Sequence, residues 1–166
     1  HAVRPLSRLT IVDRVEERAE LLGVALARDL PQTEIIVSTE VAKAISDVDI
    51  VCCATTSLVP LFEAADLPAE VHVNAIGAYR PAMHEIPAEL LADSRTYIDD
   101  RHAALTESGE IIDAVAAGLI RESDLVELGV ALRGTQSHGG RTVFKSVGVA
   151  MQDWAIADVL ARNLNS

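Results

Sequence analysis

The chain has 166 residues, of which 49% are hydrophobic and 23% are charged, a composition typical of a globular domain and not of a disordered chain. Its net charge of −11 argues against nucleic acid or an anionic membrane surface as a partner. No apolar run reaches the roughly 18 residues of a membrane-spanning helix, so no membrane partner is expected.

The first third of the chain alternates short apolar runs with helical patterns. Strands are predicted at 9–12, 34–37 and 49–54, with helices at 16–30 and 38–46 between them. The expected apolar stripe of the first long helix consists of Leu21, Leu22, Ala25 and Leu26.

The stretch 70–85, EVHVNAIGAYRPAMHE, combines a strand pattern with a turn. Its apolar run predicts a strand buried on both faces, as in a parallel sheet, and the strand ends at Gly77. Ligands of open α/β sheets bind just beyond the carboxyl ends of the strands. This turn is therefore a candidate ligand site, with His84 and Glu85 near its entrance; the alternative is an ordinary β-to-α turn in which glycine provides clearance.

The remaining elements continue the alternation. A helical turn is predicted at 60–65, helices at 87–92, 124–132 and 148–164, and strands at 96–98 and 141–144. Ser123 is expected to cap the helix at 124–132. Alternating strands and helices are typical of βαβ units, so the predicted fold class is α/β with a parallel sheet.

Asp13 follows the first predicted strand and precedes a helix. In dinucleotide-binding folds an acidic residue at the end of the second strand binds the ribose hydroxyls, and a glycine fingerprint lies roughly 20 residues earlier. Only twelve residues precede Asp13, and none is glycine. Either the fold binds no dinucleotide or the chain begins after the glycine loop; a helix cap is the simpler role for Asp13.

Cys52 and Cys53 are adjacent within an apolar run. Adjacent cysteines form a poor structural disulfide, so two buried thiols in a reducing compartment are expected, which favours the cytoplasm. No further ligands stand at a matching spacing, and no metal site is predicted.

Three stretches together resemble the ornithine cyclodeaminase/μ-crystallin family of NAD(P)-dependent enzymes. They are DIVCCATTS (49–57), HVNAIGAYRPAMHEI (72–86) and TVFKSVGVAMQD (142–153), supported by YIDDRHAALTESGEI (97–111). The resemblance covers essentially the whole chain in the family's order.

The resemblance implies a Rossmann-like, doubly wound parallel sheet joined to a substrate and dimerisation domain. It implies a partial chain that lacks the first strand and the Gly-rich loop. Residues 1–140 would form the truncated dinucleotide-binding domain, and 141–166 a C-terminal segment and helix packing toward the absent substrate domain. The full-length protein is expected to be a homodimer.

The resemblance also implies site residues. Cofactor-binding roles fall on Asp13, Ala54, Thr55, Ile76, Gly77, Ala78, Tyr79 and Ser146, and a substrate contact on Val147. Asp13 favours NAD, although Arg14 beside it leaves NADP possible. The plainer alternatives are a strand-end turn at Thr55 and a helix N-cap at Ser146.

Tyr79 stands where the cyclodeaminases carry an Asp that handles protons. A phenol has a far higher reference pKa than a carboxyl group and is a poor base near neutral pH, which argues against cyclodeaminase activity. The family's catalytic Arg and Lys would lie in the missing N-terminal part, so the catalytic residues are unknown. Arg80 and then Lys145 are the candidate substitutes, and the chain alone is expected to be inactive.

The implied function is an NAD(P)H-dependent oxidoreductase acting on a small imino or amino acid, of the ketimine reductase, cyclic imine reductase or amino-acid dehydrogenase type. One alternative is an ornithine cyclodeaminase-type lyase. Others are a non-catalytic μ-crystallin-like binding protein and a complete non-catalytic α/β module.

Overall fold

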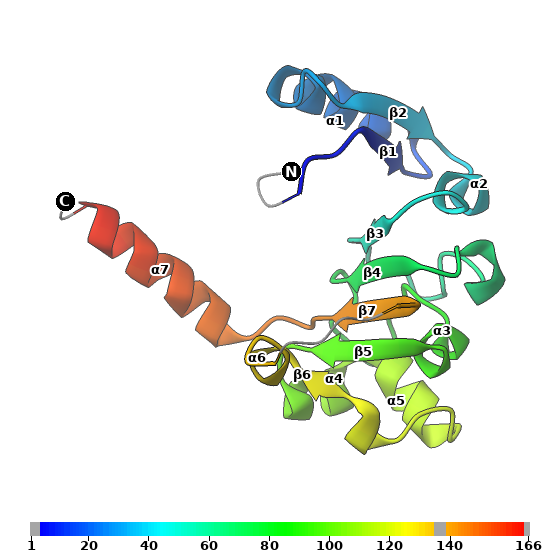
Figure 1. The fold of residues 1–166 in the computed structure, drawn as a ribbon, viewed down its shortest axis with the longest axis vertical. Helices are drawn as coiled ribbons and strands as arrows, with labels where there is room; N and C mark the ends of the chain where they lie inside the picture. Colours follow the sequence, from blue (N-terminus) through cyan, green and yellow to red (C-terminus); the bar gives the residue numbers. More distant parts are fainter. Residues whose placement is uncertain (1–3, 135–138, 165–166) are drawn as a thin grey trace. The chain divides into compact units, whose positions relative to one another are not determined.

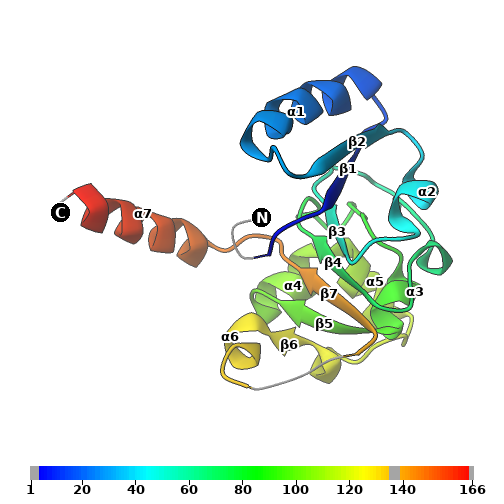
Figure 2. The ribbon, with the colours of Figure 1, turned by 45° about the horizontal axis from the view of Figure 1, so that its top comes forward.

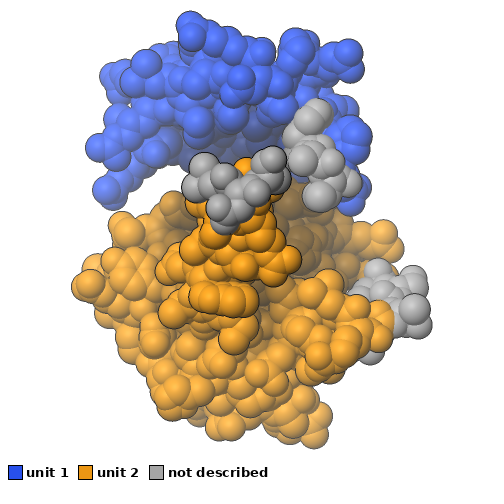
Figure 3. Space-filling model, turned by 90° about the vertical axis from the view of Figure 1, so that its left-hand side faces the viewer, with its two compact units in different colours: residues 1–48 blue, residues 49–166 orange. Residues whose placement is uncertain are grey.

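The computed structural model describes residues 4–134 and 139–164, and the chain divides into two compact units, residues 1–48 and 49–166 (Figure 3). The first unit contains β1 (Arg8–Val12), α1 (Glu16–Asp29), β2 (Glu34–Ser38) and α2 (Val41–Ile45). Strands β1 and β2 form a two-stranded parallel sheet. The predicted parallel pairing is therefore present in this unit.

Helix α1 packs on its sheet through small residues. Its buried residues are Ala19 and Gly23, whereas Leu21 is 72% exposed, so the predicted leucine stripe is wrong. Gly23 faces the sheet, where a Cβ atom would make ordinary van der Waals contact with Ile35 at 3.4 Å and Val37 at 3.5 Å. Leu21 and Leu22 lie on the outer surface of α1, and Leu26 is half-buried.

The second unit is built on a five-stranded sheet with the order β3-β4-β7-β5-β6, in which every pair is parallel (Figures 1 and 2). The strands are β3 (Ile50–Cys53), β4 (Val71–Ala75), β5 (Ser94–Ile98), β6 (Val126–Glu127) and β7 (Arg141–Lys145). The helices are α3 (Ala88–Ala92), α4 (Arg101–Glu107), α5 (Gly109–Ala116), α6 (Leu128–Ala131) and α7 (Ala150–Leu164). The predicted α/β class is confirmed.

The two faces of this sheet differ. One face carries Val73, Val143 and Ile98, all fully buried, on the side of α5. On the other face, Phe144 and residues of α6 border a cavity of about 380 Å³. Helices therefore lie on both faces, as in a doubly wound sheet.

Residues 124–132 differ from the predicted helix. A 3₁₀ turn at Glu122–Asp124 is closed by the Asp124 carboxylate, which accepts the N–H of Arg121 at 2.9 Å. The next residue, Leu125, is 2% exposed and leads into β6, which pairs with β5. The helix is limited to α6. The helical turn predicted at 60–65 is a 3₁₀ turn at Ala64–Asp66.

Helix α7 follows β7 and carries several exposed apolar side chains. They are Met151, Trp154, Ile156, Val159 and Leu160. Within residues 4–134 and 139–164, no helix is both long enough and apolar enough to cross a bilayer.

Candidate functional site

Four adjacent parallel strands end at one edge of the five-stranded sheet, and the loops that follow them lie close together. The N–H of Ile76, after β4, donates to the Cys53 carbonyl of β3 at 3.0 Å. The N–H of Ser146, after β7, donates to the Ala75 carbonyl of β4 at 3.1 Å. This edge therefore collects backbone and side chains from segments far apart in the sequence.

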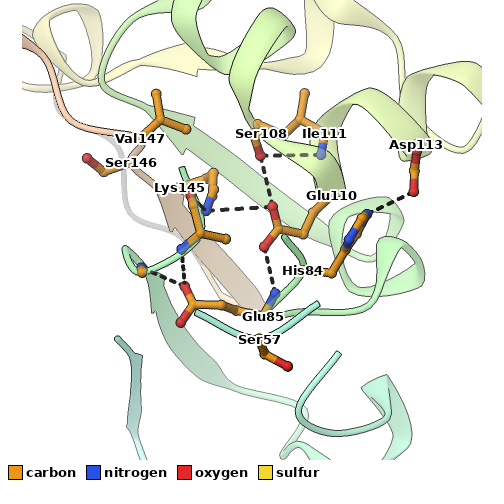
Figure 4. Close-up of polar contacts among 12 residues, drawn as sticks. Ser57, His84, Glu85, Ser108, Glu110, Ile111, Asp113, Lys145, Ser146 and Val147 are labelled. Carbon is orange, nitrogen blue, oxygen red and sulfur yellow. Dashed lines mark hydrogen bonds and ion pairs between the residues drawn. The ribbon is translucent and has the colours of Figure 1, made fainter. Parts of the chain in front are cut away.

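Glu85 is fully buried beneath two of these loops (Figure 4). Its Oε1 atom accepts the N–H of Thr55 and, at 3.0 Å, the Thr55 hydroxyl. Its Oε2 atom accepts the N–H groups of Gly77 at 2.6 Å and Ala78 at 3.1 Å. One carboxylate thus ties the loop after β3 to the loop after β4.

Two further ionic side chains, Glu110 and Lys145, lie near Glu85 and are also fully buried (Figure 4). Glu110, in the first turn of α5, accepts the N–H of Glu85 at 2.8 Å and the Ser108 hydroxyl at 3.0 Å. Lys145 Nζ lies 3.6 Å from Glu110 Oε2 and donates to the Ala78 carbonyl at 2.7 Å. Within the described residues, each of the three side chains has at least one polar partner in the protein.

Gly77 is required by the approach of the two loops. A Cβ atom at this position would lie 2.2 Å from both the N and O atoms of Thr55 and 2.6 Å from Glu85 Oε1. Glycine therefore provides clearance between the two loops, as expected for an ordinary β-to-α turn. The same clearance allows Glu85 to reach both loops.

Two sequence-based assignments need correction here. Lys145 was the second candidate for a substrate-binding cation, but it is fully buried and committed to Glu110 and Ala78. Glu85 was expected near the entrance of the site, but it lies beneath the turn. Lys and Glu side chains are usually exposed, so their residue type gives no indication that Lys145 and Glu85 are buried.

Asp99, one residue after β5, fixes the segment that follows β7. Its Oδ2 atom accepts the Ser146 hydroxyl at 2.6 Å and the N–H groups of Val147 at 3.2 Å and Gly148 at 3.1 Å. Gly148 has a positive φ of 84°, which glycine adopts readily. The sequence did not single out Asp99 as a site residue; its place at a strand end was the available signal.

The outer surface of the edge is apolar and aromatic. Ile76 is 51% exposed and Tyr79 is 43% exposed, and Ala54 is also exposed. The Arg80 guanidinium lies 5.2 Å from the centroid of the Tyr79 ring. Because Glu85 engages the N–H groups of the turn, this surface suits a flat, weakly polar group better than a phosphate.

The structure brings eight of the nine proposed site residues into the second unit, in the loops after β3, β4 and β7. They are Ala54, Thr55, Ile76, Gly77, Ala78, Tyr79, Ser146 and Val147. Asp13 belongs to the first unit, directly after β1, and its Oδ1 atom accepts the N–H of Val15 at 2.8 Å. Val15, and not Asp13, occupies the N-cap position of α1.

Both cysteines are free thiols, with Cys53 buried and Cys52 exposed. Burial raises the pKa of the Cys53 thiol to about 12, with a smaller contribution from the Glu85 carboxylate. The expectation of two buried thiols is therefore half right. Within the described residues, no group of three or more His, Cys, Asp or Glu side chains is placed to hold a metal ion.

Comparison with known proteins gives a consistent set of relatives. The sequence model of the Ornithine cyclodeaminase/mu-crystallin family matches residues 1–166. A Delta(1)-pyrroline-2-carboxylate reductase of Bacillus cereus is 34% identical over 96% of this chain and 50% of the relative. The chain therefore spans about half the length of the curated relatives it matches.

Solved structures of similar proteins have the same fold as this chain. A Thermococcus litoralis Delta(1)-pyrroline-2-carboxylate reductase, in complex with NADH and L-proline, superposes with a TM-score of 0.84 at 27% identity, covering 92% of this chain and 48% of the other. An archaeal alanine dehydrogenase dimer with bound NAD has a TM-score of 0.83 at 29% identity, covering 98% and 51%.

Replacing Gly77 with Ala is expected to lower the free energy of unfolding by roughly 2–4 kcal/mol, because the new Cβ collides with the Thr55 backbone. Urea denaturation measures the change. Gly129→Ala is the matched control, since a Cβ there meets no atom of the described residues within 4 Å. Equal stability of the two variants would contradict the close approach of the loops.

Iodoacetamide near pH 8 is expected to alkylate Cys52 and spare Cys53 in the native protein. The pKa of the Cys53 thiol is raised to about 12, so the thiol stays protonated and unreactive near pH 8. Its burial also keeps the reagent from reaching the sulfur atom. Peptide mass spectrometry should find one modified cysteine in native buffer and two in urea. Rapid native labelling of Cys53 would contradict its burial.

Proposed function

Because the chain belongs to the ornithine cyclodeaminase/mu-crystallin family, we propose that it is part of an NAD(P)H-dependent oxidoreductase acting on a small imino or amino acid. The proposed substrate is a ketimine or cyclic imine such as Δ1-pyrroline-2-carboxylate, or the corresponding amino acid. The B. cereus and T. litoralis reductases support this substrate class, and the archaeal alanine dehydrogenase supports the amino-acid direction.

The observation that carries the proposal is the turn held by Glu85. The N–H groups of Thr55, Gly77 and Ala78 all donate inward to the carboxylate, so the turn is not a phosphate cradle. Its outer surface, with Ile76 and Tyr79 exposed, is instead suited to one side of a nicotinamide ring. When bound, the cofactor supplies hydride transfer, and the protein orients it.

Each part of the cofactor has proposed partners in this chain. Asp13 would accept hydrogen bonds from the adenosine ribose, since its Oδ2 atom makes no hydrogen bond within the described part of the chain. Ala54, Thr55, Ile76, Gly77, Ala78, Tyr79 and Ser146 would lie around the nicotinamide half. Val147, held by Asp99, would face the substrate. NAD is the proposed cofactor, with NADP the alternative.

The substrate carboxylate requires a cation, and Arg80 is the candidate within this chain. Its guanidinium is exposed and lies against Tyr79, next to the proposed nicotinamide surface. A cyclodeaminase-type lyase is less well supported, because Tyr79 replaces the acidic residue that such a reaction needs.

The domain contacts, assembly and location of the intact protein are part of the same proposal. Residues 141–166 would end in a helix, α7, that packs on a substrate domain, and the exposed Trp154 and Leu160 support such a contact. We propose a homodimer, as in the archaeal alanine dehydrogenase, located in the cytoplasm, where the free thiols Cys52 and Cys53 stay reduced.

The intact protein that contains this chain is expected to oxidise NADH when given Δ1-pyrroline-2-carboxylate or a six-membered cyclic imino acid. Loss of absorbance of the reduced nicotinamide measures the rate, and chromatography identifies the amino acid formed. Ornithine, with NAD, serves as the lyase control. Tight nucleotide binding without turnover of any imine would favour a binding protein instead.

Asp13→Asn is expected to reduce the preference for NADH over NADPH by roughly tenfold, because it removes a negative charge that repels the 2′-phosphate. Dissociation constants of both nucleotides, measured by isothermal titration calorimetry, give the ratio. Glu17→Gln, an exposed carboxylate of α1, is the matched control. If the ratio of the two dissociation constants is the same in Asp13→Asn as in the unmodified protein, Asp13 does not contact the cofactor.

A further inference from the structure

The buried cluster at the edge of the five-stranded sheet is not neutral. It contains two carboxylates, Glu85 and Glu110, and one ammonium group, Lys145, all fully buried. Within 4 Å of these groups, the described residues provide one ion pair, Lys145 with Glu110 at 3.6 Å. The cluster therefore carries one excess negative charge when all three groups are ionised.

The excess charge resides on Glu85. Glu110 is compensated by Lys145 and lies in the first turn of α5, where the helix dipole stabilises an anion. Glu85 has four neutral donors instead: the N–H groups of Thr55, Gly77 and Ala78, and the Thr55 hydroxyl. Since every one of these partners donates, Glu85 satisfies its hydrogen bonds as a carboxylate and needs no proton.

The charge lies one hydrogen bond behind the loop backbone. The bonds to Gly77 and Ala78 measure 2.6 and 3.1 Å, and the flanking side chains Ile76 and Tyr79 face outward. A charge in such a dry environment acts over a longer range than it would in water.

We propose that Glu85 is a positioning residue whose buried charge favours the oxidised nicotinamide, which is cationic, over the reduced form, which is neutral. The inference rests on the proposed function, because it assumes that the nicotinamide lies over this turn. It assigns to Glu85 a second role beyond joining the two loops. The ratio of the dissociation constants for NAD⁺ and NADH is then set partly by this carboxylate.

Calorimetric titration of the intact protein with NAD⁺ and with NADH tests the proposal. Glu85→Gln removes the charge and is expected to shift the affinity ratio toward NADH on the order of tenfold. Glu85→Asp keeps the charge and shortens the side chain, so both affinities should fall while the ratio stays near the original. A merely structural role would weaken both forms of the cofactor alike in both variants.

Lys145→Met provides a test of opposite sign that does not depend on the folding of the Glu85 variants. It raises the excess to two negative charges and is expected to move the ratio toward NAD⁺. Glu107→Gln removes a charge from the exposed end of α4 and should leave the ratio unchanged. Circular dichroism checks that each variant is folded.

The outcomes separate the two levels of the proposal. If the unmodified protein binds neither NAD⁺ nor NADH, the proposed function is wrong. If it binds both, and the ratio in folded Glu85→Gln or Lys145→Met equals that of the unmodified protein, the function stands and the role of the Glu85 charge is overturned. Opposite shifts in the two variants support it.

Discussion

The Glu85 carboxylate is the constraint on which the edge of the five-stranded sheet depends. Burying an ion costs several kcal/mol unless its hydrogen bonds are made within the protein, so the loops after β3 and β4 must present their N–H groups to it. Thr55, Gly77 and Ala78 do so, and Lys145 fixes the Ala78 carbonyl from the other side. The orientation of these peptide groups is therefore set before any ligand arrives, and the turn offers an apolar outer surface.

A second carboxylate, that of Asp99, fixes the segment after β7 in a similar way. Asp99 holds the Ser146 hydroxyl and the two N–H groups that follow it, so the residues after β7 are fixed relative to β5. Strand β7 itself lies between β4 and β5, which places Ser146 beside the turn at Gly77. Two carboxylates, Glu85 in the loop after β4 and Asp99 directly after β5, thus organise loops that come from four strands.

Much of this could be predicted from the sequence, because buried parallel strands have a clear signature. The apolar run before Gly77 predicted β4 and the turn that follows it, and the family motifs singled out the loops of the candidate site. Packing that depends on absent or charged side chains was not predictable. Helix α1 buries Ala19 and Gly23 instead of its leucines, and Glu85 and Lys145 are buried although their residue type predicts exposure. The short β6 also escaped detection, since two residues show no periodicity.

The position of β7 has a consequence for how the protein is made. Val143 pairs with Val73 on one side and with Thr96 on the other, so the centre of the sheet depends on contacts between distant parts of the chain. During synthesis, β4 and β5 leave the ribosome well before the strand that separates them. Until β7 arrives, each presents an unpaired edge, which slows folding and exposes the nascent chain to misassembly. The half-built sheet is therefore a stage at which the nascent chain can be lost to misassembly.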